Sequence, residues 1–186
     1  GYTQPDLAHI IAKHNLTQAI IDLDYAAKLS KYASEKNVTV DAHLKIDTGM
    51  SRIGFIPNAQ SIDEIISVSK LPNIEIEGIF THFANSDSSD ESMTVKQFEK
   101  FMNLIGELES RGLYIPVKHC CNSAAIVKYP HMHLDMVRAG IILYGMYPSD
   151  IDYDIDLKPL MKFKTSVTNI KTMQPGDTIS YGATYT

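Results

Sequence analysis

Two hydrophobic patterns alternate along most of the chain. Short, nearly continuous apolar runs are typical of strands covered on both faces, whereas the segments between them carry apolar residues at the spacing of a helix with one buried face. The predicted strands are residues 18–21, 38–46, 74–81 and 117–121, and the predicted helices lie at residues 6–11, 23–29, 58–68, 94–110 and 123–128. Another apolar stretch covers residues 136–143. The alternation over residues 18–143 predicts parallel strand–helix–strand units and an α/β fold.

The pattern changes after Pro148. An acidic linker is predicted at residues 150–158, followed by strands at 167–171 and 177–180 that are joined by a turn at Gln174-Pro175-Gly176. No helical period intervenes. We therefore expect two domains, a barrel part over residues 1–154 and the start of a β-rich domain over residues 155–186.

The composition is that of a globular protein and argues against several classes of partner. Of 186 residues, 44% are hydrophobic and 21% are charged, so a core can form. The net charge of −5 offers no basic surface to nucleic acid or to anionic lipid. There is no apolar segment of about 20 residues and no signal-peptide pattern, so we expect no membrane contact.

The cysteines and the chain ends add two further expectations. Cys120 and Cys121 are adjacent and lack the spacing of a disulfide framework or a zinc site, which favours a reducing, cytoplasmic setting. Gly1 opens the chain without an initiator methionine, and residues 181–186 end it without a helix cap or a charged tail. We expect an excerpt from a longer enzyme.

Cationic or titratable side chains stand at or just past the ends of apolar runs. Lys45 and Arg52 flank the turn at residues 47–49, His82 follows the strand at 74–81, and Arg138 follows Val137. In a barrel enzyme, catalytic residues gather where the strands end, so this repetition predicts an active-site rim.

Other polar clusters have plainer interpretations. His131 and His133 form a His-x-His pair, but no third ligand has a suitable spacing, so we expect a solvated loop and no metal site. Cys120-Cys121 is expected to fill a strand end. The acidic run at residues 87–91 is expected to be a solvated cap region before the long helix.

Five strings, taken together, resemble the alanine racemase family, whose enzymes use pyridoxal 5'-phosphate (PLP). They occur in the family's order and at similar spacing over nearly all of the chain. The matching segments are residues 43–50 (His-Leu-Lys-Ile-Asp-Thr-Gly-Met) with Arg52, 81–83 (Thr-His-Phe), 122–125 (Asn-Ser-Ala-Ala), 137–141 (Val-Arg-Ala-Gly-Ile) with 143–145 (Leu-Tyr-Gly), and 180–185 (Ser-Tyr-Gly-Ala-Thr-Tyr).

This resemblance implies a fold and a reaction. The fold is a (β/α)8 TIM-type barrel that carries PLP, incomplete in this chain and followed by a β-rich domain, in a homodimer with shared active sites. The reaction is reversible removal of the α-proton of an amino acid by two bases, one on each face. One base is the Schiff-base lysine, which in the family lies upstream on the first barrel strand and falls outside this chain. Lys45 is not that lysine, because it belongs to a different strand.

The resemblance assigns the second base to Tyr181, acting in the partner's site through a relay from Tyr181 to His82 to Arg138. A phenol has an ordinary pKa of about 10, so it needs nearby cations to act as a base. Tyr185 competes with Tyr181 for this role. Arg138 is also expected to face the pyridine nitrogen of PLP and keep it unprotonated, because arginine does not give up its proton. The alternative for Arg138 is a local salt bridge to Asp135.

The remaining site residues follow from the same resemblance. Arg52 is expected to bind the phenolic oxygen of PLP and the substrate carboxylate, and Lys45 is a candidate for carbamylation that would position Arg52. A phosphate cradle is expected from Ser123 with the backbone N–H groups of Gly140 and Ile141, supported by Asn122.

The function expected is that of an alanine racemase that supplies D-alanine for bacterial peptidoglycan, with this excerpt inactive alone. Two alternatives stay open. One is the serine or serine/alanine racemase domain of a membrane protein of the glycopeptide-resistance type. The other is a barrel that binds PLP without turnover, against which the intact trio of Tyr181, His82 and Arg138 argues.

Overall fold

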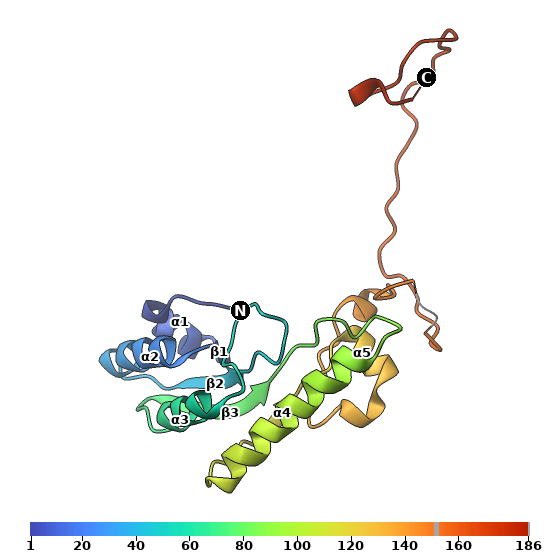
Figure 1. Cartoon of the computed structure of the whole chain (residues 1–186). Coiled ribbons are helices and arrows are strands. Elements are labelled where there is room, and N and C mark those ends of the chain that lie inside the picture. Colours follow the sequence, from blue (N-terminus) through green and yellow to red (C-terminus); the bar gives the residue numbers. More distant parts are fainter. Residues whose placement is uncertain (151–152, 186) are drawn as a thin grey trace.

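A computed structural model describes residues 1–150 and 153–185 (Figure 1). Four parallel strands form its sheet, in the order in which they occur along the chain. They are β1 (Gln18–Ile20), β2 (Val40–Lys45), β3 (Ile74–Phe80) and β4 (Val117–His119). The four predicted strands and their parallel pairing are therefore confirmed, although β4 is shorter than predicted.

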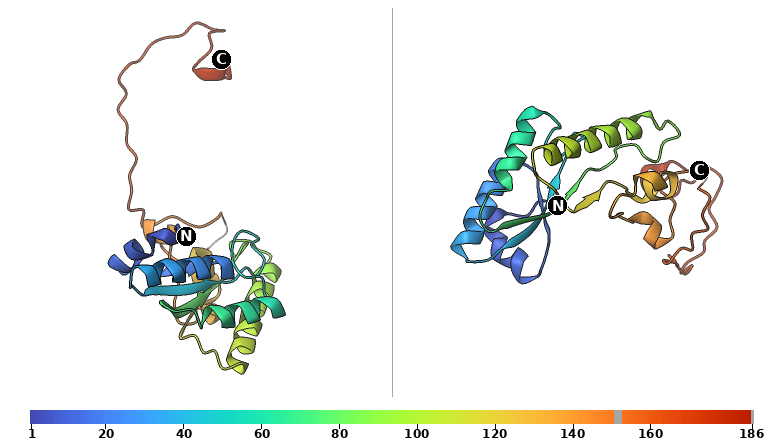
Figure 2. Two further views of the ribbon diagram at one scale, coloured as in Figure 1. Left: turned by 90° about the vertical axis from the view of Figure 1, so that its left-hand side faces the viewer. Right: turned by 90° about the horizontal axis from the view of Figure 1, so that it is seen from below.

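The helices that connect the strands lie along one face of this curved sheet (Figure 2, right). Their boundaries follow from the capping residues. The Asp22 carboxylate accepts a hydrogen bond from the Tyr25 N–H (2.7 Å), and Asn58 does the same for Ser61 (2.9 Å), so both helices begin where an N-cap side chain is available. The described helices are η1 (Pro5–Leu7), α1 (Ala8–Lys13), α2 (Leu23–Glu35), α3 (Ala59–Val68), α4 (Ser92–Ser110), α5 (Ser123–Lys128), and the short turns η2 (Pro130–Met132), η3 (Ile141–Tyr144) and η4 (Tyr181–Ala183).

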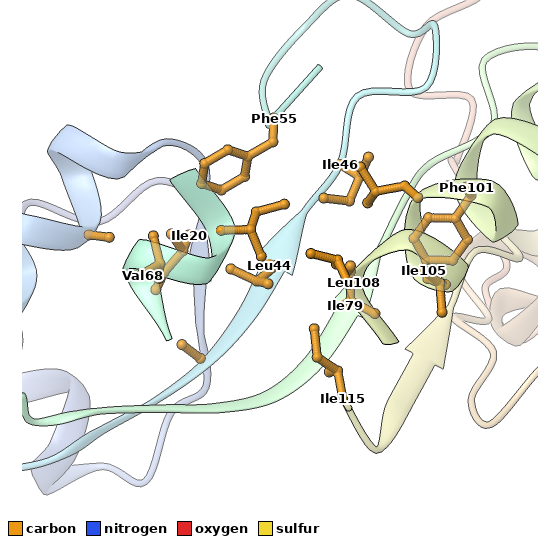
Figure 3. Close-up of a cluster of buried hydrophobic side chains, with 14 of the residues drawn as sticks. Ile20, Leu44, Ile46, Phe55, Val68, Ile79, Phe101, Ile105, Leu108 and Ile115 are labelled. Carbon is orange, nitrogen blue, oxygen red and sulfur yellow. The ribbon is translucent and has the colours of Figure 1, made fainter. Parts of the chain in front are cut away.

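The core lies between the strands and these helices, as Figure 3 shows for the labelled side chains. Leu44 and Ile79, from β2 and β3, are fully buried and pack in the same cluster as Val68 of α3 and Phe101 of α4. Strand geometry sends alternate side chains to opposite faces, so a strand that buries Leu44 toward the helices points its odd-numbered neighbours the other way. In β2 those neighbours include Lys45, which thus faces the inside of the curved sheet.

The chain after residue 144 departs from the predicted pattern. The strands predicted at 167–171 and 177–180 are wrong: the described residues there hold one isolated antiparallel bridge, between Ile179 and Tyr185. The turn at 174–176 does form, with the Asp177 N–H donating to the Gln174 carbonyl (3.0 Å). Two isolated strands are marginal without a third strand or a helix to pack on, and this segment extends away from the body (Figures 1 and 2).

The acidic linker, the domain boundary and the absence of membrane contact were also predicted from the sequence. Part of the predicted acidic linker, residues 151–152, lies outside them, and the domain boundary at 154/155 stays a prediction. Among the helices described, none combines the length and the apolar character needed to cross a membrane.

Candidate functional site

Three polar or aromatic residues stand side by side where the strands end. The strand register pairs Lys45 of β2 with Phe80 of β3, and Phe80 with His119 of β4. The Phe80 ring stacks on the His119 ring with centroids 4.8 Å apart and lies 5.7 Å from the Lys45 ammonium. Parallel strands end at the same edge of a sheet, so Lys45, the predicted site residue of this row, lies at the edge where a barrel enzyme carries its active site.

Arg138 connects this row to the loops beyond it. One guanidinium nitrogen, Nη1, donates to His119 Nδ1 (2.6 Å). The other, Nη2, contacts His82 Nδ1 (3.1 Å) and the carbonyl oxygens of Thr81 (2.9 Å) and Cys120 (3.2 Å). The alternative of a salt bridge to Asp135 is wrong, because that carboxylate accepts the Lys118 N–H (2.9 Å) instead.

The two histidines beside Arg138 are uncharged at neutral pH. Burial, together with the charges of Arg138, Arg52 and Lys45, lowers the pKa of His82 to about 4. A guanidinium only donates hydrogen bonds, so His82 Nδ1 must accept and the imidazole proton resides on Nε2. His82 therefore offers an N–H donor on the side away from Arg138.

Lys45 is almost fully buried, with only 3% of its surface exposed. Its ammonium donates to the Ile46 carbonyl (2.7 Å). Burial lowers the pKa of Lys45 to about 8; the Asp47 carboxylate opposes this, and Arg138 and Arg52 add to it. A buried amine with this pKa is partly neutral near neutral pH and can act as a nucleophile.

The loop that carries Arg52 is organised by one carboxylate. Asp47 Oδ1 accepts the backbone N–H groups of Gly49 (3.0 Å), Met50 (2.9 Å) and Ser51 (3.0 Å), and Oδ2 accepts that of Arg52 (3.0 Å). Burial alone would raise the pKa of Asp47, but these N–H donors outweigh it and lower that pKa.

Removing this carboxylate should free the loop in a selective way. In Asp47→Ala we expect the amides of residues 49–52 to exchange with solvent roughly ten- to a hundredfold faster, since each loses a charge-assisted hydrogen bond. Asp47→Asn keeps an oxygen for residues 49–51 and should free Arg52 alone. Hydrogen exchange followed by NMR on the intact protein measures both, and equal protection in wild type and Asp47→Ala would contradict the proposed organisation of the loop.

Arg52 itself is exposed and borders a pocket of about 510 Å³ that also includes Lys100. The pocket that holds His82 is a different one, of about 270 Å³, and Met50 is the residue of this loop that lines it. The structure thus does not bring Arg52 into one pocket with the other predicted site residues.

The predicted phosphate cradle lies in the smaller pocket, where His82, Asn122, Ser123 and Ile141 meet. Ser123 Oγ accepts the Gly140 N–H (2.9 Å), and a Cβ added at Gly140 would approach this oxygen to 3.3 Å. The Gly140 N–H, which was predicted to face the phosphate, is therefore bonded to Ser123, and the Ser123 hydroxyl proton takes no part in that bond.

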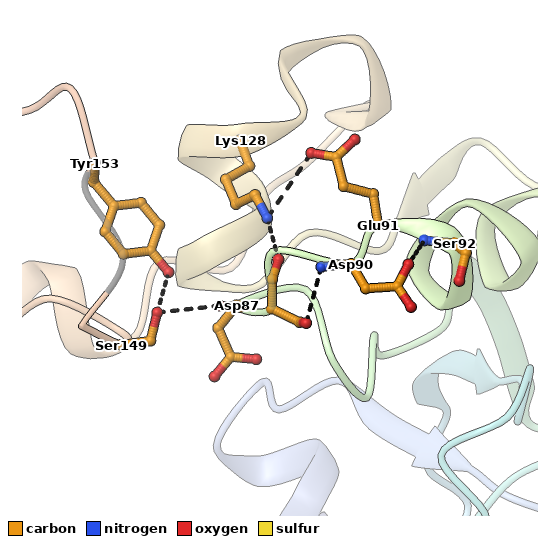
Figure 4. Close-up of polar contacts among 8 residues, drawn as sticks. Asp87, Asp90, Glu91, Ser92, Lys128, Ser149 and Tyr153 are labelled. Atoms are coloured by element: carbon orange, nitrogen blue, oxygen red, sulfur yellow. Dashed lines mark hydrogen bonds and ion pairs between the residues drawn. The ribbon is translucent and has the colours of Figure 1, made fainter.

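Asn122 links two segments that border this pocket. Its Oδ1 accepts hydrogen bonds from the Ala125 N–H (3.1 Å) and from Ser86 Oγ (2.8 Å), which joins the start of α5 to the loop that follows β3. That loop is held further along as well: Lys128 of α5 binds the Ser88 carbonyl, and Ser149 Oγ donates to the Asp87 carbonyl (3.1 Å) (Figure 4).

Tyr181 is not part of this assembly within a single chain. It opens η4 in the extended segment, and its side chain is fully exposed. Its competitor, Tyr185, is also exposed and takes part in the isolated bridge to Ile179. The structure therefore joins Arg138 and His82 but leaves the third member of the predicted relay apart.

Two residues of the site were not indicated by the sequence pattern, His119 and Gln97. His119 ends an ordinary short strand. Gln97 is buried on the inner side of α4, where its amide accepts the Ala84 N–H (2.9 Å) and donates to Thr48 Oγ1 (3.2 Å) and the His82 carbonyl (3.3 Å). A polar side chain at helical spacing from Phe101 and Leu104 was the available signal, since such positions are usually apolar.

The remaining polar clusters have structural roles. His133 contacts the Ile126 carbonyl (2.8 Å) and His131 is exposed, and no group of three metal-binding side chains occurs among residues 1–150 and 153–185. Cys120 and Cys121 are buried after β4, where both thiols donate to the Met132 carbonyl (3.1 and 3.2 Å). Asp90, in the acidic run before α4, accepts the N–H of Ser92, the first residue of that helix (2.9 Å), whereas the N-cap residue Glu91 makes no side-chain capping bond.

Comparison with known proteins identifies the family. The model described as "Alanine racemase, N-terminal domain" matches residues 1–148. The alanine racemase of Clostridium tetani (strain Massachusetts / E88) is 46% identical over 184 residues, which are 98% of this chain and 48% of that protein. The chain spans about half the length of the curated relatives that it matches.

Solved structures agree. An alanine racemase of Clostridium difficile 630 superposes with a TM-score of 0.91 at 42% identity, covering 100% of this chain and 49% of that one. A histidine racemase from Leuconostoc mesenteroides subsp. sake NBRC 102480 superposes with a TM-score of 0.85 at 28% identity, covering 100% and 50%. These matches confirm the α/β class and the assignment to the TIM-barrel part of such enzymes, and they show that this chain belongs to the alanine racemase family.

Proposed function

We propose that this chain is part of a PLP-dependent alanine racemase that interconverts L-alanine and D-alanine in a bacterial cytoplasm, supplying D-alanine for peptidoglycan. We further propose a homodimer with shared active sites. The observation that carries the proposal is Arg138, a guanidinium held between two neutral histidines beside a pocket with a serine hydroxyl. A site that only bound a phosphate would have no use for this arrangement.

The pocket suits PLP, the cofactor of this family. Ser123 would donate its hydroxyl to the phosphate together with the Ile141 backbone N–H, while the absence of a side chain at Gly140 keeps the approach open. Arg138 would donate to the ring nitrogen without protonating it. When bound, PLP supplies an electron sink that acidifies the α-proton of the amino acid, and an unprotonated ring makes that sink weaker.

The base on the second face would be Tyr181 from the other copy of the chain. His82 directs its Nε2–H away from Arg138, because Nδ1 is occupied by the guanidinium. A donated N–H from an imidazole fixed beside a cation stabilises a phenolate. His82 would thus prepare Tyr181 to take or return the α-proton while itself staying neutral.

Arg52 would bind the substrate carboxylate through charge-assisted hydrogen bonds. Its exposed position and its neighbour Lys100 make a cationic rim at the larger pocket. We propose that Lys45 approaches the Arg52 loop as a carbamate, formed when its neutral amine attacks carbon dioxide and releases a proton. A negative group at this place would remove the repulsion between buried Lys45 and both arginines.

Carbamylation should follow the low pKa of Lys45. At a fixed pressure of labelled carbon dioxide, the carbamate ¹³C signal of the intact protein should grow as the pH rises through about 8, since only the neutral amine reacts. Lys45→Arg should abolish the signal, and Lys128→Arg, which alters a lysine of α5, should retain it. A signal that persists in Lys45→Arg would show that another amine is modified.

The function itself is tested by substrate choice. The full-length protein, reconstituted with PLP, should racemise L-alanine much faster than L-serine or L-histidine, measured by chiral chromatography. Preference for serine would support the glycopeptide-resistance type of racemase, and preference for histidine would place the protein with the histidine racemase. A PLP-bound protein that racemises none of the three would support the non-catalytic barrel and overturn the proposal.

A further inference from the structure

Two histidines meet beneath the site because a glycine lies between them. The register places His43 of β2 opposite Gly78 of β3. The His43 ring occupies the space over Gly78, where an added Cβ would come within 2.6 Å of the imidazole. With no side chain in between, His43 Nδ1 reaches to within 2.9 Å of His119 Nε2 on β4.

The hydrogen bonds through these rings run in one direction. Arg138 Nη1 can only donate, so His119 Nδ1 accepts and its ring proton resides on Nε2. His119 Nε2–H then donates to His43 Nδ1, which leaves the proton of His43 on its own Nε2. The guanidinium therefore fixes the tautomers of both rings. In turn, the bond to His119 holds the Nη1 group of the guanidinium in place.

We infer that His119, supported by His43 across Gly78, is a positioning residue for Arg138. Its part is to hold the guanidinium so that Nη2 faces His82 and a donor remains for the cofactor's ring nitrogen. The cofactor part of this inference rests on the proposed function, whereas the tautomers and the orientation of Arg138 do not.

The surroundings of His119 suit such a role. The ring is 97% buried and lies flat on Phe80, with an angle of 2° between the two rings, so it cannot turn without losing the stack. Burial, together with the neighbouring Arg138 and His43, lowers the pKa of His119 to about 3. It therefore stays neutral, and an acceptor for Arg138, throughout the range in which the protein is handled.

The test compares two substitutions of His119 in the full-length protein, one that removes the hydrogen-bond acceptor for Arg138 and one that keeps an acceptor. His119→Phe keeps a flat ring on Phe80 but removes the acceptor. His119→Asn carries an oxygen close to the position of Nδ1 and can still accept from Arg138. The readouts are the ¹⁵N spectrum of the histidines, the affinity for PLP measured by fluorescence titration, and the visible spectrum of bound PLP.

In the wild type, we expect the His119 resonances of an imidazole protonated on Nε2 alone. His119→Phe should weaken PLP binding roughly ten- to a hundredfold and alter its visible spectrum, because an acceptor for a charged donor is lost. His119→Asn should stay within roughly threefold of the wild-type affinity and keep its spectrum. Gly78→Ala should displace His43 and remove the tautomer signature of His43 while the chain remains folded by circular dichroism.

Some outcomes would overturn the inference. These are a His119 protonated on Nδ1, an unchanged PLP affinity and spectrum in His119→Phe, which would leave the ring with a packing role only, or equal losses in the Phe and Asn variants, which would show that restoring the acceptor does not restore the site. Failure of the proposed function gives a different result: the wild-type protein binds no PLP, or binds it without racemising any amino acid. The ¹⁵N spectrum then still reports the tautomers of His119 and His43.

Discussion

Replacement of Arg138 by methionine is expected to abolish racemisation and to weaken PLP binding severely. Methionine fills the space but donates no hydrogen bond, so His82, His119 and two carbonyl oxygens lose their donor at once. Each buried acceptor left without a partner costs about 1–3 kcal/mol, and the cation that prepares the second base is lost as well. We expect a fall in kcat/KM of at least about a thousandfold, measured in the full-length enzyme, with a lower unfolding temperature.

Controls separate loss of charge from loss of fold. Arg111→Met removes another arginine, one that forms a surface ion pair with Asp63 (2.6 Å) and does not line the pocket of His82, and it should leave racemisation unchanged. Arg138→Lys keeps the charge but cannot bind two imidazoles and two carbonyls with one ammonium, so it should recover stability better than activity. Wild-type kinetics in Arg138→Met would remove Arg138 from the mechanism.

Loss of the Tyr181 hydroxyl is expected to impair one half of the reaction. Tyr181→Phe should lower kcat for racemisation by about 10²–10⁴-fold, which is the usual contribution of a general acid–base group. Exchange of the α-proton with deuterated solvent should persist for the enantiomer served by the remaining base and disappear for the other. Proton NMR of L-alanine and D-alanine, followed separately, measures this difference.

Tyr185→Phe is the matched control, because Tyr185 lies in the same motif and is also exposed. It should leave exchange from both enantiomers intact. The reverse result, with Tyr185→Phe defective and Tyr181→Phe normal, would transfer the role to Tyr185.

Mixed dimers decide whether the tyrosine comes from a second copy of the chain. Tyr181→Phe and Arg138→Met are each expected to be inactive. If the active sites are shared, a dimer of one with the other has one site in which wild-type Tyr181 and wild-type Arg138 meet, and activity returns on mixing. If each chain completed its own site, the mixture would stay inactive.

Much of the fold was predictable because it depends on local signals. Asp22 and Asn58 begin their helices through bonds to backbone N–H groups three residues ahead, and the apolar runs defined four strands. The predictions for residues 167–171 and 177–180 were wrong because a strand needs a neighbour, and the pattern of a single segment does not show whether one is present.

The site was predictable only where a motif preserved it. Arg138, His82 and Ser123 were named from strings that resemble a family; in the structure His82 and Ser123 line one pocket, and Arg138 contacts His82. His119 lies in none of these strings. Its place in the site depends on the His43 ring, which lies over Gly78 and contacts His119 from 76 positions away in the sequence. Tyr181 was also named from such a string, but within a single chain it is exposed and lies apart from the other three.

The amide of Gln97 has a mechanical consequence. It is the link by which α4, a helix on the outer side of the sheet, holds the loop after β2 at Thr48 and the loop after β3 at His82 and Ala84. These two loops carry the predicted carboxylate-binding arginine and the predicted relay histidine. A shift of α4 along its axis would therefore change the spacing between the loop after β2 and the loop after β3, so the helix on the outer side of the sheet sets the distance between the two loops on its inner edge.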